Sequence, residues 1–486
     1  MNDDFSFFIY DFESFGINPA QDRPAQFAGV RTDKDFNIID KPIILYCKQT
    51  NDYLPSPEAV LVTGITPQEC NEKGIPEPEF AERILQEFSR PNTCIMGYNN
   101  IRYDDELTRY LFYRNFFDAY EYSWKNGNSR WDLLDLVRAC YALRPEGINW
   151  AFDDQNIPSF KLENLTKVNN IEHSNAHDAM ADVYATIELA KLIKQKQPQL
   201  FNYHFNHRIK KNIINEKIYE KGHENALINI AELKPLVHVS GMLGNYRANC
   251  SWIAPLEWHP TNQNAIIVCD LDSNIDALLT EQAEKLRKNL YTKKSELEEI
   301  GELPVPLKLV HLNKSPFLAP PKTLSPTRAE QLGINRKRCL ENLEKLRKST
   351  TIRQKVVDIF NEKIIFKDDD IEAALYNGFF SRNDKSNMEI LHSIIKTDPK
   401  KLAEHRLCFE DSRIEKLLFH FRARHFYKTM TRAEQVKWDK YRRQKLEKSL
   451  TQFEESIRRL AREHENNAEN IKLLKDLYEY ASKLCN

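Results

Sequence analysis

The chain has 486 residues, 41% of them hydrophobic and 11% aromatic, which suffices for two or three buried cores and excludes a disordered protein. Its formal net charge of −1 excludes a uniformly cationic surface, so a polyanion would have to bind where positive charge is locally concentrated. The nine cysteines lie at least nineteen residues apart, a spacing that excludes CxxC zinc motifs and shows no disulfide framework.

The N-terminal segment has no basic region, and its apolar run at 5–10 is too short for a signal peptide. That run predicts instead a buried strand that ends at Asp11. Because no part of the sequence reaches the ~18 consecutive apolar residues of a membrane span, we expect a soluble, cytoplasmic protein.

Strands and helices then alternate, which predicts an α/β domain. The last helix of this part, at 178–194, has Met180, Val183 and Ile187 at helical spacing. The other elements are expected as strands at 25–32, 43–46 and 93–97 and as helices at 80–88, 104–117 and 131–143.

The remaining chain changes character twice. Short strand-like runs at 237–239, 265–269 and 308–312 are separated by Gly, Asn and Pro, which predicts a domain that contains strands. From residue 353 onward the sequence becomes helical and has few turn residues, which predicts a third, helical domain.

Asp11 and Glu13 are the first candidate site residues. In an extended strand, residues i and i+2 point to the same side, so the two carboxylates would meet. Two anions at the end of a buried strand require a cation, and oxygen ligands without sulfur favour Mg²⁺ or Mn²⁺ over zinc. Taken alone, Asp-x-Glu is a common pattern that also fits a solvated strand end.

Two further acids and a histidine also lie at the edges of predicted elements. Asp182 lies inside the helix at 178–194, and His177 comes five residues earlier, about 140° around an ideal helix. The histidine can therefore share a site with Asp182 only from the loop before the helix. Asp104 follows an asparagine-rich turn and opens a helix. Taken singly, Asp104 and Asp178 are equally well explained as helix caps, and His177 as a surface residue.

Together, the order Asp-x-Glu, Asp, His-x₄-Asp resembles the DEDDh exonuclease superfamily. The likeness runs nearly end to end through further motifs, which resemble those of the bacterial exodeoxyribonuclease I family. These motifs are Phe15-Gly16, Asp22-Arg-Pro-Ala-Gln-Phe, Val62-Thr-Gly-Ile-Thr-Pro, Asn128-Ser-Arg-Trp-Asp-Leu, Arg144-Pro-Glu-Gly-Ile-Asn, His238-Val-Ser-Gly-Met, Leu375-Tyr-Asn-Gly-Phe-Phe-Ser and Glu415-Lys-Leu-Leu-Phe.

The resemblance implies an α/β ribonuclease H-like exonuclease domain at 1–197, an SH3-like β-containing domain at 198–352 and an α-helical C-terminal domain at 353–486. The implied activity is processive 3′-to-5′ hydrolysis of single-stranded DNA to 5′-mononucleotides, in DNA repair and recombination. A monomer without a membrane partner is expected.

The resemblance also implies two Mg²⁺ ions, for which Mn²⁺ would substitute. Two such ions can stabilise both the attacking and the leaving oxygen of a displacement at phosphorus. His177 would be the general base, since an imidazole with a pKa of about 6.5 accepts a proton near neutral pH. The expected metal ligands are Asp11, Glu13, Asp104 and Asp182.

The segment 109–131 holds nine aromatic residues interspersed with arginines and lysine. Flat side chains beside cations bind single strands without sequence preference, although we expect Phe112, Phe116 and Trp131 in the core. Lys161 stands where the family pattern has arginine, so its phosphate contact would lack a bidentate geometry. The resemblance assigns DNA contacts to Arg109, Tyr120, Trp124, Arg138 and Lys161.

Positive charge is concentrated near the C-terminus. Residues 413–448 contain twelve Lys or Arg and four acids, which fits either a solvated helical face or a basic wall beside the DNA strand. Given the expected polyanionic substrate, we favour the wall. Family members also bind the acidic C-terminal tail of single-stranded DNA-binding protein in a basic pocket, to which Arg144 and Tyr203 would belong.

Two other functions share parts of this pattern. An RNA-trimming exonuclease has the same catalytic residues, because the choice between ribose and deoxyribose depends on pocket shape. The long chain beyond the exonuclease domain argues against that alternative. A catalytically silent DNA-binding or scaffold protein is the other alternative, and the complete set of four acids and a histidine argues against it.

Overall fold

The computed structural model describes residues 4–173, 178–220, 223–361, 370–404 and 407–485. His177 lies outside these residues, so its predicted place in the loop before the helix stays a prediction. The chain divides into two compact units. The first contains Met1–Asn128, Ser174–Tyr184 and Phe366–Asn486, and the second contains Ser129–His173 and Ala185–Ile365.

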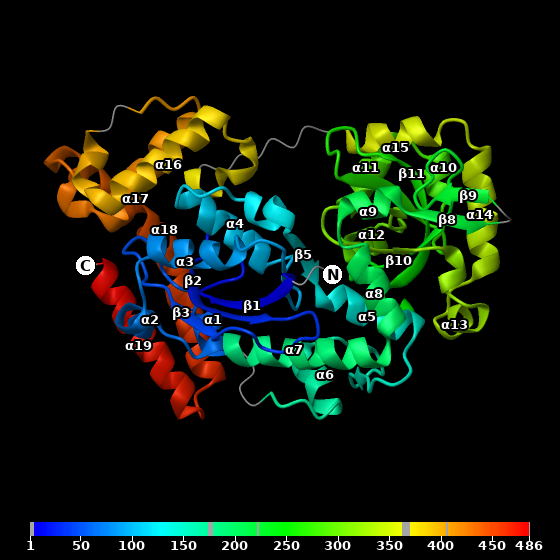
Figure 1. Ribbon diagram of the computed structural model, residues 1–486, viewed down its shortest axis with the longest axis horizontal. Coiled ribbons are helices and arrows are strands. Elements are labelled where there is room, and N and C mark those ends of the chain that lie inside the picture. Colours follow the sequence, from blue (N-terminus) through cyan, green and yellow to red (C-terminus); the bar gives the residue numbers. More distant parts are fainter. Residues whose placement is uncertain (1–3, 174–177, 221–222, 362–369, 405–406, 486) are drawn as a thin grey trace. The chain divides into compact units, whose positions relative to one another are not determined.

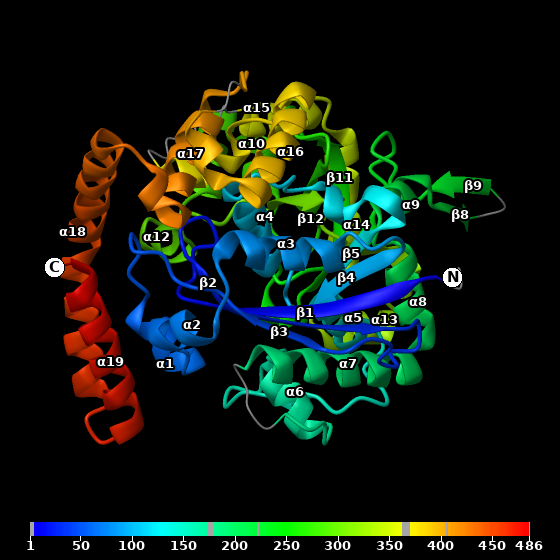
Figure 2. The same cartoon turned by 60° about the vertical axis from the view of Figure 1, so that its left-hand side comes forward.

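A mixed sheet is the base of the first unit. Its strands follow the order β3-β2-β1-β4, and β1 pairs antiparallel with β2 and parallel with β4. Strands β1, β2 and β3 are labelled in Figure 1, and β4 is labelled in Figure 2. The strands predicted at 25–32, 43–46 and 93–97 are confirmed. The bounds are β1 Ser6–Ser14, β2 Pro24–Thr32, β3 Ile43–Tyr46 and β4 Thr93–Gly97.

Strand β1 extends past its predicted end. The prediction placed that end at Asp11, where the first apolar run stops, but the pairing of β1 with β2 continues to Ser14. Phe12 keeps this extension in the core, because its ring is 5% exposed and packs on Phe27. Asp11 and Glu13 therefore lie within the strand, on the face opposite to Phe12.

Helices α3 (Glu77–Phe88) and α4 (Asp104–Arg114) complete the core of this sheet. Apolar residues of both helices form one buried cluster with Phe8, Tyr10 and Phe12 of β1. The predicted helix at 104–117 ends early, because the backbone turns at Phe116, whose φ is +63°. Further helices here are α1 (Pro57–Thr63), α2 (Pro67–Lys73) and the start of α7 (Ala179–Lys196).

The C-terminal helices from residue 371 onward belong to the same compact unit, and the helical character expected for this part of the chain is confirmed. Helices α18 and α19 lie side by side (Figure 2), and Phe453 and Leu477 from this pair pack on Phe15. Leu417 of α17 packs with Tyr113 of α4. The bounds are η5 Ile371–Asn377, α16 Arg382–Thr397, η6 Pro399–Ala403, α17 Ser412–His425, η7 Tyr427–Thr429, α18 Arg432–Glu463 and α19 Ala468–Cys485.

Buried ion pairs join the C-terminal helices to the N-terminal part of this unit. Arg23 pairs with Glu372 at 2.5 Å, Arg424 pairs with Asp52 at 2.6 Å and also with Glu372, and Lys445 lies 3.3 Å from Asp52. Burial alone would raise the pKa of Asp52 and Glu372, but Arg424 and its basic neighbours hold both well below their usual values. We call these five residues the buried ion-pair network.

The second unit contains a sheet with the strand order β13-β12-β11-β10-β14 around a core that includes Ile253, Ile266 and Val310. The strands predicted at 237–239, 265–269 and 308–312 are present as β10, β12 and β13. Within the described residues, the strands that belong to the second unit are β5 Ser129–Asp132, β6 Ala151–Phe152, β7 Pro158–Ser159, β8 Lys217–Glu220, β9 His223–Ala226, β10 Leu236–Val239, β11 Cys250–Trp258, β12 Ala265–Asp270, β13 Leu307–His311 and β14 Phe317–Ala319.

The second unit also contains helices, and α10, α11 and α12 lie between the strands predicted at 265–269 and 308–312. The helix expected at 131–143 begins at Leu133, because β5 precedes it and Asp132 accepts a hydrogen bond from the Leu134 amide. Across the described segments, none of the helices has both the length and the apolar character of a membrane span. The helices are α5 Leu133–Leu143, α6 Leu162–Val168, α8 Pro198–Asn206, α9 Lys210–Asn215, α10 Asp276–Thr280, α11 Ala283–Leu290, α12 Lys294–Glu299, α13 Pro326–Gln331, α14 Arg336–Lys348 and α15 Ile352–Phe360.

Glu77 gives a test of how much a buried ion pair stabilises the first unit. Its carboxylate accepts hydrogen bonds from Arg114 and Asn115, each at 2.9 Å. Burial raises the pKa of Glu77, but Arg114 and Arg23 outweigh that effect and lower it to about 2. We expect Glu77→Gln to lower the free energy of unfolding at neutral pH by about 3–5 kcal/mol, because Arg114 keeps a buried charge without its counter-charge. Urea denaturation measures this loss.

The pH dependence of the same variant has a defined sign. Because the folded pKa of Glu77 lies below its unfolded value of 4.5, its contribution is present above that value and is lost as the pH falls towards 2. Wild-type protein should therefore lose more stability than Glu77→Gln over this interval. Glu79→Gln, whose exposed carboxylate pairs with Arg83, is the matched control and should behave like wild type. Equal acid sensitivity of wild type and Glu77→Gln would contradict the assignment.

Candidate metal and nuclease site

Three carboxylates predicted as metal ligands converge in the first unit. Asp11 and Glu13 come from alternate positions of β1, and Asp182 comes from the first turn of α7. One carboxylate oxygen of each lies within 4.8 Å of the others, so a single cation could contact all three. We call Asp11, Glu13 and Asp182 the carboxylate cluster. Residues more than 160 positions apart in sequence thus share one place, as the motif order predicts.

Asp104, the fourth predicted ligand, lies at the start of α4 and is 6% exposed. Its Oδ1 accepts a hydrogen bond from the backbone amide of Phe12 at 3.2 Å, which places it beside the strand segment between Asp11 and Glu13. The N-cap position of α4 is occupied by Tyr103, which makes no side-chain capping bond. The alternative interpretation of Asp104 as a capping residue is therefore wrong.

Burial and mutual repulsion both disfavour the charged forms of these acids. Burial, together with the negative charges of Asp182 and Asp104, raises the pKa of Glu13 to about 9. Burial and the charges of Asp104, Glu13 and Asp182 likewise raise the pKa of Asp11 well above its usual value. A divalent cation would remove this repulsion, and a site made only of carboxylate oxygens fits a hard ion such as Mg²⁺ or Mn²⁺.

The N-terminus of α7 is held by two polar side chains. Asp178 accepts hydrogen bonds from the amides of Met180 and Ala181, each at 3.1 Å, so its predicted role as a helix cap is confirmed. Gln26, which sequence reasoning missed, lies opposite Glu13 in the β1–β2 ladder. Its Oε1 accepts a hydrogen bond from the Ala179 amide at 3.1 Å. Gln26 thus connects the sheet to the helix that carries Asp182.

Arg109 and Tyr120, two DNA-binding candidates of the first unit, lie next to each other. The Arg109 guanidinium is 7% exposed, donates to Glu106 at 3.0 Å and lies 5.4 Å from the centre of the Tyr120 ring. It also donates to the hydroxyl of Tyr376 at 3.1 Å. Trp124 is 62% exposed and is accessible to a nucleobase. The structure thus places Arg109 in a fixed position among aromatic rings.

Two aromatic residues near Arg109 were not among the predicted contacts. Tyr376 belongs to η5, and Phe379, which is 83% exposed, lies edge-on to Tyr120 at 5.4 Å between ring centres. Both belong to the motif at 375–381, which sequence reasoning used only as a mark of family likeness. Phe112, Phe116 and Trp131 are buried, as predicted.

The remaining predicted contacts belong to the second unit. Arg138 donates to Asp135 at 2.9 Å, and a Cβ at Gly241 would lie only 2.9 Å from its guanidinium, so glycine permits this close approach. Lys161 is exposed and lies 3.6 Å from Glu163. Of the two predicted tail-binding residues, exposed Arg144 donates to the Thr323 carbonyl at 3.1 Å, and Tyr203 donates to the Leu318 carbonyl at 2.8 Å.

The basic segment 413–448 is less cationic at the surface than its composition suggests. Four of its twelve basic side chains pair with acids of the same unit. Arg413 pairs with Asp411, Arg422 pairs with Glu434, and Arg424 and Lys445 take part in the buried ion-pair network. A basic wall beside the DNA, as predicted, would therefore have to be formed by the other basic side chains of this segment.

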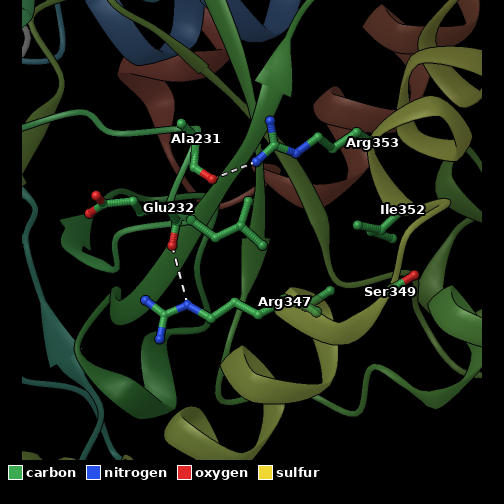
Figure 3. A pocket seen from close by; sticks show the side chains of 8 residues that line it. Ala231, Glu232, Arg347, Ser349, Ile352 and Arg353 are labelled. Carbon is green, nitrogen blue, oxygen red and sulfur yellow. Dashed lines mark hydrogen bonds between the residues drawn. The ribbon is translucent and has the colours of Figure 1, made fainter.

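A pocket of about 370 Å³ in the second unit has a different chemistry (Figure 3). Arg347 and Arg353 line it, but both donate to backbone carbonyls, at 3.2 Å to Glu232 and at 2.7 Å to Ala231. Its other lining residues include Ser349 and apolar side chains. It therefore lacks the converging acids of the carboxylate cluster.

The raised pKa of Glu13 predicts how the metal-free protein responds to pH. Because the folded pKa of about 9 exceeds the unfolded value of 4.5, the folded state binds more protons in between, and stability falls as the pH rises through this interval. In the presence of a chelator, Glu13→Gln should lose less thermal stability than wild type over this range. Calorimetric melting temperatures measure the difference.

With Mg²⁺ present, wild type should instead lose less thermal stability than Glu13→Gln over the same pH range. The ion would bind the ionised Glu13 carboxylate, which the variant lacks. Glu72→Gln, a substitution of an exposed acid in α2, is the matched control and should follow wild type. Parallel melting profiles for wild type and Glu13→Gln, with and without the metal, would show that the pKa of Glu13 is not raised in the folded protein.

Models of known protein families match most of the chain. A model described as "Exonuclease" matches residues 8–190. A model of the exonuclease I SH3-like domain matches residues 220–362, and one of the exonuclease I C-terminal domain matches residues 369–484. The predicted order of an exonuclease domain, an SH3-like domain and a helical C-terminal domain is thereby confirmed.

Full-length relatives agree with this assignment. The chain is 68% identical to exodeoxyribonuclease I of Haemophilus influenzae over 482 residues, which cover 99% of both chains. It is 52% identical to exodeoxyribonuclease I of Escherichia coli over 481 residues, which cover 99% of this chain and 98% of that one.

Solved structures show the same likeness. The Escherichia coli exonuclease I complex with a dA16 oligonucleotide has a TM-score of 0.93 at 52% identity, covering 99% of this chain and 100% of that one. A zinc-bound form of the Escherichia coli enzyme with single-stranded DNA also has a TM-score of 0.93, at 51% identity and with the same coverage. With an exonuclease domain that carries the converging acids and with relatives matched over their whole length, the chain belongs to the exodeoxyribonuclease I family.

Proposed function

We propose that this protein is a processive 3′-to-5′ exonuclease that hydrolyses single-stranded DNA to 5′-mononucleotides in DNA repair and recombination. The observation that carries the proposal is the carboxylate cluster, in which Asp11, Glu13 and Asp182 lie within reach of one cation. Relatives named exodeoxyribonuclease I and similar structures that contain single-stranded oligonucleotides support the substrate.

In this proposal, Asp11, Glu13, Asp104 and Asp182 hold two Mg²⁺ ions, for which Mn²⁺ substitutes. When bound, such a pair of ions stabilises both the attacking and the leaving oxygen of an in-line displacement at phosphorus. His177 accepts the proton of the attacking water. The raised pKa of Asp11 and Glu13 supports the metal role, because these acids gain most from a nearby cation.

The strand is held by stacking and by fixed positive charge. In the first unit, Tyr120 and Trp124 offer aromatic faces, and Arg109 supplies a charge between Tyr120 and Tyr376. Stacking of this kind tolerates any base, which suits an enzyme that degrades strands regardless of sequence. In the second unit, Arg138 and Lys161 are the proposed DNA contacts.

A protein partner completes the proposal. We assign to Arg144 and Tyr203 a part in a basic pocket that binds the acidic C-terminal tail of single-stranded DNA-binding protein. Exposed Arg144 and the neighbouring Arg328, which donates to the carbonyls of Tyr141 and Ala142, supply positive charge on this part of the second unit.

Substrate choice tests the proposed function directly. Labelled single-stranded DNA, double-stranded DNA and RNA are incubated with the protein and Mg²⁺, and the products are separated by length. We expect 3′-to-5′ shortening of single-stranded DNA with release of mononucleotides, and no shortening in the presence of a chelator. Digestion of RNA alone would favour an RNA-trimming enzyme, and no digestion of any substrate would favour a silent binding protein.

Variants separate metal binding from proton transfer. Asp11→Asn should abolish hydrolysis and weaken Mn²⁺ binding, because it removes a ligand charge. His177→Ala should lower kcat by about 10²–10⁴-fold and leave Mn²⁺ binding near the wild-type value, because the histidine acts on water. Rapid-quench kinetics and Mn²⁺ titration measure the two effects. Loss of Mn²⁺ binding in His177→Ala would contradict the assigned role of the base.

A further inference from the structure

Two residues next to the proposed metal ligands make a buried contact with each other. Tyr10 precedes Asp11 in β1, and Asp105 follows Asp104 in α4. The Tyr10 hydroxyl donates a hydrogen bond to Oδ1 of Asp105 at 2.8 Å, with Tyr10 1% and Asp105 0% exposed. The contact therefore joins the two elements that carry Asp11 and Asp104.

A second hydrogen bond joins the same two elements. The Phe12 amide, on the other side of Asp11 in sequence, donates to Oδ1 of Asp104 at 3.2 Å. Because alternate residues of a strand point to opposite faces, Tyr10 reaches α4 from the core side while Asp11 points to the site. The adjacent acids Asp104 and Asp105 thus have different surroundings, the former beside the ligands and the latter in the core.

The first turn of α4 depends on such contacts for its position. Tyr103 occupies the N-cap and makes no side-chain capping bond. The Asp105 amide instead donates to the Asn100 carbonyl at 2.9 Å, and the Asp105 side chain accepts from Tyr10. A hydrogen bond to a buried carboxylate is among the stronger ones in proteins, so it can hold this turn in one orientation.

We propose that Tyr10 and Asp105 are positioning residues for the metal site, and that their hydrogen bond holds Asp104 in the place from which it reaches the metal bound by Asp11. The inference rests on the proposed metal role of these two acids. It assigns the second aspartate of the Asp104-Asp105 pair a task distinct from that of the first. Partners that orient metal ligands commonly change metal affinity when they are removed.

The experiment measures Mn²⁺ binding to the full-length protein by the electron paramagnetic resonance signal of free Mn²⁺. We expect Tyr10→Phe and Asp105→Ala each to raise the dissociation constant about 10- to 100-fold. The double variant should bind no more weakly than the weaker single variant, because both changes remove the same contact. Asp105→Asn keeps an acceptor oxygen and should recover most of the affinity.

Two controls separate this role from a general loss of stability. Tyr113→Phe removes a hydroxyl from α4 that donates to the Ile371 carbonyl at 3.0 Å, and it should leave Mn²⁺ affinity unchanged. Calorimetric melting temperatures of all variants show whether each one folds. If one single variant fails to fold, the other together with Asp105→Asn still tests the proposal.

The outcomes also separate this inference from the proposed function. Wild-type affinity in folded Tyr10→Phe and Asp105→Ala, together with loss of binding in Asp11→Asn, would overturn the positioning role alone. Additive effects of the two substitutions would also overturn it, because independent contributions are not one contact. Wild-type Mn²⁺ binding in Asp11→Asn would instead refute the metal site itself.

Discussion

Repulsion among four buried or half-buried carboxylates is the constraint on which the rest of the site depends. Asp11, Glu13 and Asp182 come within 4.8 Å of one another, and Asp104 contributes to the raised pKa of both β1 acids. Such an arrangement persists only where the surrounding fold stabilises it independently. The long pairing of β1 with β2 and the aromatic core under Phe12 provide that stability. A bound cation converts the repulsion into binding energy.

Where the C-terminal helices meet the N-terminal part of the first unit, buried acids are paired with basic residues rather than with one another. In the buried ion-pair network, arginines and a lysine compensate Asp52 and Glu372, so the pKa of these two acids is held well below its usual value. Glu372 belongs to η5, the same short helix that presents Tyr376 to Arg109. Through η5, the buried ion-pair network is thus connected to Tyr376 and, by its hydrogen bond, to Arg109.

Sequence reasoning identified most of the regular elements and correctly placed Asp104 at the start of α4 and Asp182 within α7. Its errors have local causes. The apolar pattern stops at Asp11, but backbone pairing does not require apolar side chains, so β1 continues to Ser14. The helix at 104–117 ends early because Phe116 adopts a positive φ. This conformation is uncommon for a bulky residue, so the identity of Phe116 does not predict it. Gln26 and Tyr376 were missed because their partners are far away along the chain.

The sequence by itself determined the chemical inventory of this protein: acids in the DEDDh order, hard oxygen ligands and aromatic residues among cations. These follow from residue identity and spacing, which need no coordinates. Only the tertiary structure decided that Asp105, next to the expected ligand Asp104, is buried against Tyr10. It also decided which basic residues of 413–448 are used in ion pairs. The reason is physical, because these ion pairs and buried contacts form only when segments that are distant in sequence pack together.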